Sequence, residues 1–264
     1  MNKKSRSVEF PAVSRRTVLA GALASTWSLA ASAQPAAAAA GSKPDAERFF
    51  KAPQMTGAAL SPDGRRLAMR TIGPHRRAML TVLNLEDLKP VLVYNSDAAD
   101  VNRFVWVNND RLAFDLSDRE TPAGKLDAAP GLFAVDHDGQ GFRQLVERQY
   151  SWVKMGNDGR QLEPWNTFLL NGSSQRNSDE VLVVRPEAYD EKDVDYIKLL
   201  RLNTRNGRTT PVEGPARSVG WWADAQGNLR VALTREGEKG ALRWRDPAGD
   251  QWRTLSEFNV YTGE

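Results

Sequence analysis

The stretch that most constrains the fold is a short turn between two apolar runs, Ser61-Pro62-Asp63-Gly64. Proline presets the backbone angle of the first turn position, and glycine accepts the positive φ that other residues resist. The turn is preceded by Ala59-Leu60 and followed by Leu67-Ala68-Met69. This pattern predicts a tight β-hairpin.

Similar turn signals accompany apolar runs at four further places: 108–112, 136–139, 206–207 and 226–228. Short strands with turns at this density are typical of an all-β repeat architecture. After the first forty residues the chain shows no helical periodicity, which argues against an α/β fold.

The strands group into four units of four. The first unit is predicted at 57–61, 66–71, 78–85 and 90–94, and the second at 103–107, 111–116, 131–135 and 142–146. The third is predicted at 167–170, 180–185, 196–202 and 209–213, and the fourth at 217–222, 229–234, 241–245 and 251–255. The unit starts imply a period of roughly 45–65 residues, which suits propeller blades with loop insertions. We therefore predict a partial β-propeller of about four four-stranded blades over 49–264. Residues 148–164 fit either a further hairpin or a linker.

Residues 1–33 have the pattern of a secretory signal peptide, with a basic start, an apolar run at 18–24 and small residues before Gln34. The pair Arg15-Arg16, followed by a small gap and an apolar residue, resembles the twin-arginine export signal. The alternative is an ordinary secretory leader with a chance arginine pair.

Cleavage is predicted between Ala33 and Gln34, and residues 34–48 are predicted to be a low-complexity linker. The apolar run is too short to span a bilayer as a stable helix, so no membrane anchor is expected after leader removal. We expect an exported protein, periplasmic or secreted, that uses the twin-arginine route.

The net charge of +3 does not describe the folded part. Before residue 34, five basic residues stand against Glu9, so the rest of the chain is close to neutral and slightly acidic. A nucleic-acid partner is therefore not expected. The absence of cysteine excludes a disulfide framework, a thiolate metal site and a cysteine nucleophile.

Two acidic stretches of the sequence are candidate metal sites. Residues 190–195 lack the glycine turn and closing glutamate of a calcium loop, so a solvated charged loop is favoured. In Asp136-His137-Asp138-Gly139, a tight hairpin turn by itself favours Asp138 and Gly139. These residues therefore do not require a bound metal ion to explain them. No metal and no cofactor is predicted. Trp221-Trp222 places one ring on each face of a strand, where packing between blades is expected and lining of a binding surface is the alternative.

Three stretches, 60–68, 104–112 and 131–139, resemble the start of the N-terminal propeller of prolyl oligopeptidase-type serine peptidases. The resemblance extends over residues 45–258. It implies a seven- or eight-bladed propeller that caps a C-terminal α/β-hydrolase domain and restricts access to short peptides. The Ser-Pro-Asp-Gly hairpin also occurs in TolB-type periplasmic propellers.

The chain departs from that family where the chemistry would be. The hydrolase domain needs a Gly-x-Ser-x-Gly nucleophile elbow, and the nearest stretch, 171–175, lacks the closing glycine. The two histidines, His75 and His137, do not fit the triad order of the α/β-hydrolase fold. No catalytic residue is predicted, and the chain alone should not cleave peptides.

We therefore expect the substrate-gating propeller of an exported peptidase, whose partners are a peptide substrate and a separate hydrolase domain. The alternative is a stand-alone TolB-like propeller that binds a protein, and a third possibility is a remnant without activity. An incomplete ring leaves sheet faces and edges uncovered, which predicts self-association.

Overall fold

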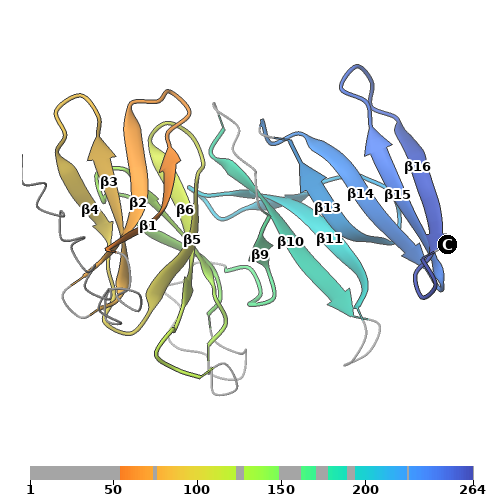
Figure 1. The fold of residues 1–264 in the computed structure, drawn as a ribbon, viewed down its shortest axis with the longest axis horizontal. Helices are drawn as coiled ribbons and strands as arrows, with labels where there is room; N and C mark the ends of the chain where they lie inside the picture. The colour runs from red at the N-terminus through yellow and green to blue at the C-terminus, as the bar shows by residue number, and fades with distance from the viewer. Residues whose placement is uncertain are drawn as a thin grey trace, which may run out of the picture. The chain divides into compact units, whose positions relative to one another are not determined.

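A computed structural model describes residues 54–73, 76–122, 128–148, 162–170, 178–188, 194–224 and 226–263. In these ranges the chain forms sixteen strands and no helix, and the strands make four antiparallel four-stranded sheets in chain order (Figure 1). Residues 52–264 form one compact unit. The predicted all-β fold, a partial β-propeller of four blades, is confirmed.

Each sheet is a meander of four successive strands. The first sheet contains β1 (Met55–Leu60), β2 (Arg66–Ile72), β3 (Ala78–Asn84) and β4 (Pro90–Tyr94). The second contains β5 (Asp100–Trp106), β6 (Arg111–Ser117), β7 (Leu132–Asp136) and β8 (Arg143–Val146). The third contains β9 (Phe168–Leu169), β10 (Glu180–Ala188), β11 (Val194–Asn203) and β12 (Thr209–Pro211). The fourth contains β13 (Ser218–Ala223), β14 (Leu229–Glu236), β15 (Lys239–Arg245) and β16 (Trp252–Asn259).

The turn between β1 and β2 forms as its sequence predicts. The backbone N–H of Gly64 donates to the carbonyl of Ser61 at 2.8 Å, and Gly64 adopts a φ of +73°. The carboxylate of Asp63 accepts hydrogen bonds from the Ser61 hydroxyl at 2.6 Å and from the Arg65 backbone at 3.1 Å. These contacts lower the pKa of Asp63, the Ser61 hydroxyl contributing most. A charged Asp63 therefore helps to close the hairpin.

The second and third sheets are apolar on both faces. In β6, Leu112 and Phe114 pack toward the first sheet, whereas Ala113 packs toward the third. In β10, Val183 packs toward the second sheet and Leu182 toward the fourth. Successive residues of a strand point to opposite faces, so each strand contributes to two cores. The buried side chains thus form three clusters, one at each junction between successive sheets.

Polar contacts reinforce these junctions. Trp221 on β13 donates its indole N–H to the carbonyl of Ile197 on β11 at 2.7 Å. Arg77, before β3, donates from Nη1 to Asp100 at 3.0 Å and to Asp118 at 2.7 Å. The first bond joins the edges of the first two sheets because Asp100 begins β5.

The end of the undecided segment 148–164 is anchored to both neighbouring sheets. Glu163 forms a single parallel bridge with Val146 at the end of β8. Its carboxylate accepts from Arg185 of β10 and from the hydroxyl of Thr209 of β12, each at 2.9 Å. Residues 149–161 lie outside the described ranges, so the choice between hairpin and linker stays open.

Candidate functional site

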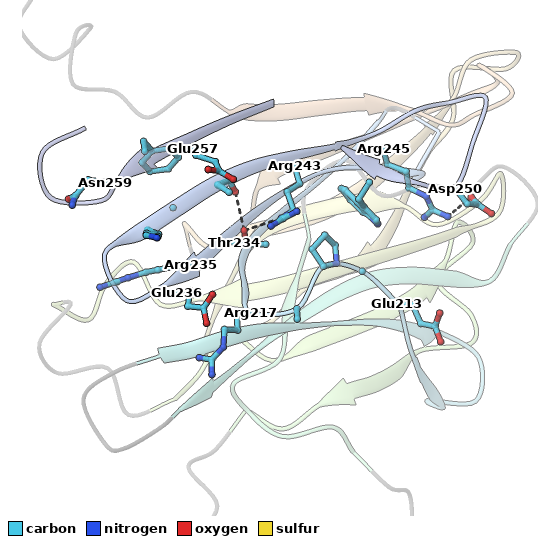
Figure 2. Close-up of a pocket in the computed structure, with 18 residues that line it drawn as sticks. Glu213, Arg217, Thr234, Arg235, Glu236, Arg243, Arg245, Asp250, Glu257 and Asn259 are labelled. Atoms are coloured by element: carbon cyan, nitrogen blue, oxygen red, sulfur yellow. Dashed lines mark hydrogen bonds and ion pairs between the residues drawn. The ribbon is translucent and has the colours of Figure 1, made fainter. Parts of the chain in front are cut away.

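A cleft lies along one face of the fourth sheet (Figure 2). Its volume is about 1230 Å³. One wall is the connection between β12 and β13, residues 213–217, and the other is formed by β14, β15 and β16. The strand register places Thr234, Ala241 and Glu257 in one row of this wall. The cleft is therefore a groove between a sheet and an irregular segment.

Arg243 stands in the middle of the sheet wall. Its Nε donates to the hydroxyl of Thr234 at 3.3 Å, and its Nη1 donates to the hydroxyl of Thr254 at 3.2 Å. Both threonines flank Arg243 on neighbouring strands, because β-sheet register brings the three side chains to one face. The guanidinium is thus oriented by neutral hydroxyl groups.

Four further cations line the same groove: Arg217, Arg235, Lys239 and Arg245. Arg235 donates to the carbonyl of Gly237 at 3.1 Å and to the hydroxyl of Tyr261 at 3.4 Å. Lys239 lies at the start of β15 and is exposed. Within the part of the chain that the structure describes, no ion pair is formed by Arg235, Lys239 or Arg243.

Carboxylates also line the cleft. Asp250 is paired with Arg245, at the end shown on the right of Figure 2. Glu213, Glu236 and Glu257 form no ion pair with a described residue. The groove therefore presents free groups of both signs, which suits a ligand that itself carries both charges and polar backbone groups.

Trp252 is one of the apolar residues that line the cleft. It meets Trp221 edge-on at 6.4 Å between ring centroids, and Trp221 in turn lies against Gly214 of the connection. A Cβ at Gly214 would lie 2.5 Å from the Trp221 ring, so a larger residue there would displace the ring or the connection. Glycine therefore sets how closely the two walls approach.

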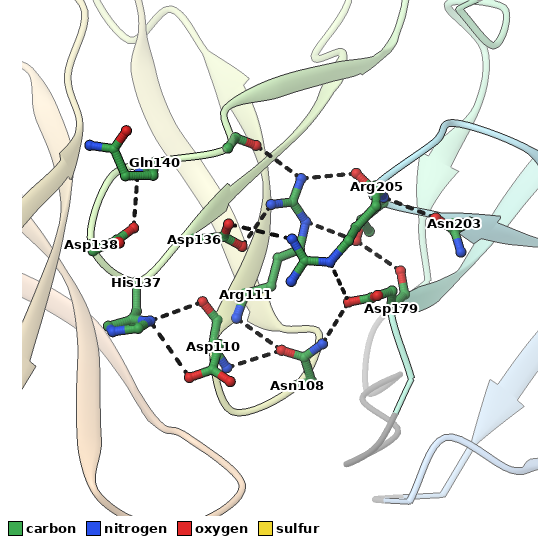
Figure 3. Close-up of polar contacts among 12 residues, drawn as sticks. Asn108, Asp110, Arg111, Asp136, His137, Asp138, Gln140, Asp179, Asn203 and Arg205 are labelled. Carbon is green, nitrogen blue, oxygen red and sulfur yellow. Dashed lines mark hydrogen bonds and ion pairs between the residues drawn. The ribbon is translucent and has the colours of Figure 1, made fainter.

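A second polar cluster lies between the second and third sheets, at the turns shown in Figure 3. Arg111 is 2% exposed and donates to Asp136 at 2.8 Å, to the Thr204 hydroxyl at 3.0 Å and to the Thr204 carbonyl at 2.9 Å. Arg205 joins the cluster through Asp136 and Asp179, at 3.4 Å and 3.0 Å. Burial lowers the pKa of Arg205, but these two carboxylates outweigh it and the pKa is raised. The cluster holds two sheets together.

The turn 136–139, one of the two candidate metal sites in the sequence, belongs to this cluster. Asp136 is engaged by Arg111 and Arg205, and Asp138 accepts from the backbone of Gln140 at 2.9 Å. The Nδ1 of His137 lies 3.3 Å from the carbonyl of Asp110. These contacts are those of a hairpin turn. The contacts of His137 do not include the serine hydroxyl that a catalytic triad would place beside it.

Several predicted positions lie outside the described residues. They are the export pair Arg15 and Arg16, the cleavage pair Ala33 and Gln34, His75, the stretch 171–175, and residues 190–193 of the acidic stretch 190–195. Asp195, at the end of the acidic run, is described and pairs with Arg217 at 3.3 Å. No helix in the described ranges is long and apolar enough to cross a membrane.

Sequence reasoning missed the cleft. Arg243 and Arg245 alternate with Leu242 and Trp244 along β15. That alternation predicts a strand with one polar and one apolar face, and it is the sequence signal from which the polar wall of the cleft could have been inferred. It does not reveal that the connection 213–217 lies opposite, because that contact depends on the preceding sheet.

Comparisons with known proteins give structural likenesses only. No family model and no curated protein matches the chain. An oligogalacturonate lyase in complex with manganese is 16% identical with a TM-score of 0.49, and the match covers 79% of this chain and 55% of that one. The propeller domain of the Trilobed protease from Pyrococcus furiosus is 13% identical with a TM-score of 0.47, covering 76% and 56%.

A structure described as one of two prolyl endopeptidases is also similar, at 13% identity and a TM-score of 0.48. The match covers 77% of this chain and 29% of that chain. The chain thus spans little more than half of the first two proteins and less than a third of the third. None of these likenesses assigns an activity to it.

Proposed function

We propose that this chain is the substrate-gating propeller portion of an exported prolyl oligopeptidase-like serine peptidase. The bond cleavage would be carried out by an α/β-hydrolase domain outside this sequence. The supporting observation is the succession of four meander sheets in a sequence that contains no Gly-x-Ser-x-Gly motif. In this proposal the propeller binds and admits peptides and does no chemistry itself.

The cleft on the fourth sheet is the proposed peptide-binding surface. Its volume of about 1230 Å³ exceeds that of most small-molecule pockets, which are about 300–1,000 Å³. An extended peptide would place a carboxylate on Arg243 and a side chain on Trp252. Glu257, on the strand beside Arg243, offers a partner for a peptide cation or N–H group.

Peptide binding can be tested by titrating the full chain with acetyl-tetra-alanine and measuring tryptophan fluorescence. The peptide is used in two forms, one with a free carboxyl terminus and one with a carboxamide terminus. The free acid should bind, and the amide should bind more weakly. Arg243→Gln should weaken binding of the acid about tenfold, as expected for one charge-assisted hydrogen bond. Arg65→Gln, in the exposed β1–β2 turn, is the matched control and should change nothing.

The absence of a nucleophile is tested with a fluorophosphonate probe. The purified chain should remain unlabelled and should not hydrolyse peptides. Covalent labelling would overturn the proposal, as would equal binding of acid and amide by the wild type and Arg243→Gln.

A second candidate is a stand-alone TolB-like propeller that binds a protein partner. The half-exposed ring of Trp222 on the outer face of the fourth sheet favours it, because large exposed aromatic side chains mark protein contacts. A downstream reading frame that encodes Gly-x-Ser-x-Gly with later aspartate and histidine would favour the peptidase. Tight binding of a folded protein and no binding of short peptides would favour the module.

A further inference from the structure

The fourth sheet carries apolar side chains on both faces, and one of those faces packs on nothing in the described structure. Trp221 and Ala232 point toward the third sheet and belong to its core cluster. Alternate residues of the same strands point the other way. This opposite surface, called the Trp222 face, contains Trp222, Val231, Leu233, Leu242, Trp244 and Phe258, and the guanidinium of Arg253 lies over the Trp244 ring.

The Trp222 face is flattened by two glycines. A Cβ at Gly220 would lie 2.9 Å from the ring of Trp222, and a Cβ at Gly240 would lie 2.5 Å from the ring of Phe258. The ring of Trp222 therefore lies over its own strand, β13, and the ring of Phe258 lies over the neighbouring strand β15. Trp222 is nonetheless 50% exposed. Removing water from a largely apolar surface of this kind lowers the free energy.

The first sheet has a corresponding surface on which no other described sheet packs. Ala59, Ala68 and Val82 lie in one row and face the second sheet. The residues that alternate with them form the Leu92 face: Leu60, Leu67, Met69, Thr81, Leu83 and Leu92, of which Met69 and Thr81 are buried. Leu60 is 58% and Leu92 48% exposed. An antiparallel sheet with one solvated face would carry polar residues at such positions.

We propose that a second copy of this chain covers both faces, with the Trp222 face of one copy packed on the Leu92 face of the other. The proposal continues an interface that the molecule already contains three times, in which one sheet packs its face on the next. Every copy carries both faces, so a twofold pair satisfies both at once. The proposal does not depend on the proposed function.

The test is the mass of the full chain by light scattering after size exclusion, from about 1 µM to about 100 µM. The wild type should run at twice the 29.3 kDa of one chain. Trp222→Glu and Leu92→Glu should each run as monomers, since a buried charge at the centre of an interface weakens it at least about tenfold. Leu88→Glu, at an exposed leucine in the β3–β4 turn, is the control and should stay dimeric.

Mixing the two variants gives the sharper result. A pair of one Trp222→Glu copy and one Leu92→Glu copy keeps one intact interface, so an equimolar mixture should recover dimers that neither variant forms alone. Circular dichroism must show that both variants keep the wild-type strand signal. A monomeric wild type overturns the proposal and leaves these faces to another protein. Dimers that survive Trp222→Glu, or a mixture that stays monomeric, overturn it as well.

Discussion

The indole Nε1 of Trp106 donates a hydrogen bond to the backbone carbonyl of Ala59 at 2.9 Å. Trp106 belongs to β5 and Ala59 to β1, so the bond joins the first strands of two successive sheets. The ring is buried in the core cluster between them. One side chain thus supplies both apolar contact and a partner for a backbone group at this junction.

Replacing that donor should destabilise the protein. Trp106→Phe keeps an aromatic ring but removes the N–H and some volume, so we expect the free energy of unfolding to fall by about 2 kcal/mol. Trp221→Phe, which removes the bond to Ile197, should give a similar loss. Tyr261→Phe, at an exposed ring, should change little. Urea denaturation measures all three, and a loss for Tyr261→Phe equal to that of Trp106→Phe would contradict the assignment.

Arg111 should be irreplaceable even by lysine. Its guanidinium reaches four acceptors across the second and third sheets, the fourth being the carbonyl of Gly141 at 3.1 Å. Arg111→Met should cost about 3 kcal/mol of stability, because it leaves buried groups without their partner. Lysine cannot reproduce the planar fork, so Arg111→Lys should recover less than half of that loss. The exposed Arg208→Met is the control for loss of charge, and equal destabilisation by it would refute this account.

Acid should weaken the junction of the first two sheets. Burial raises the pKa of Asp100, but hydrogen bonds from the backbone of Ala78 and Arg119 and from Arg77 outweigh it, so the pKa is lowered. The Thr121 hydroxyl and then Arg77 hold the pKa of Asp118 well below its usual range. A carboxylate with a lowered folded-state pKa contributes stability above its unfolded-state value, near 4, and loses it as pH falls further.

Asp100→Asn should therefore be destabilising at neutral pH, and its difference from the wild type should shrink as the pH is lowered from about 4 to about 2. Urea denaturation across this range measures the slope. Asp250→Asn, at a largely exposed carboxylate, should leave the wild-type slope unchanged. A difference for Asp100→Asn that is constant with pH would show that its charge is not the source of the effect.

Export should depend on the arginine pair. Arg15→Lys with Arg16→Lys should abolish processing if the leader uses the twin-arginine route, because that route reads the pair itself. An ordinary secretory leader would tolerate the change, since lysine keeps the basic start. Fractionation measures the outcome, and sequencing the mature amino terminus should find Gln34. Unchanged export of the double variant would favour the ordinary leader.

The fold could be predicted because its signals are local. The turn at Ser61–Gly64 and the alternation along β6 and β10 are both visible within a dozen residues, and they sufficed for the strands and for the four-sheet grouping. Strand ends differ by a few residues, as in β5, which begins at Asp100 and not at 103 and has a register shift between Val101 and Phe104. What could not be predicted are contacts such as Arg111 with Thr204, 93 residues apart, and the groove around Arg243. The contact of Arg111 leaves no mark on its neighbours in sequence, and the alternation along β15 marks only the polar wall of the groove, not the segment opposite it.

The strands of the second and third sheets contribute side chains to a core on each face, and this limits where residues can be inserted or deleted. A single residue inserted within β6 would turn Phe114 toward the space that Ala113 occupies, and would disturb two cores in one step. A residue inserted within β10 would likewise reverse the faces to which Leu182 and Val183 point. Variation in length is therefore tolerable only in connections between strands, and the middle of the molecule can evolve by substitution but not by insertion.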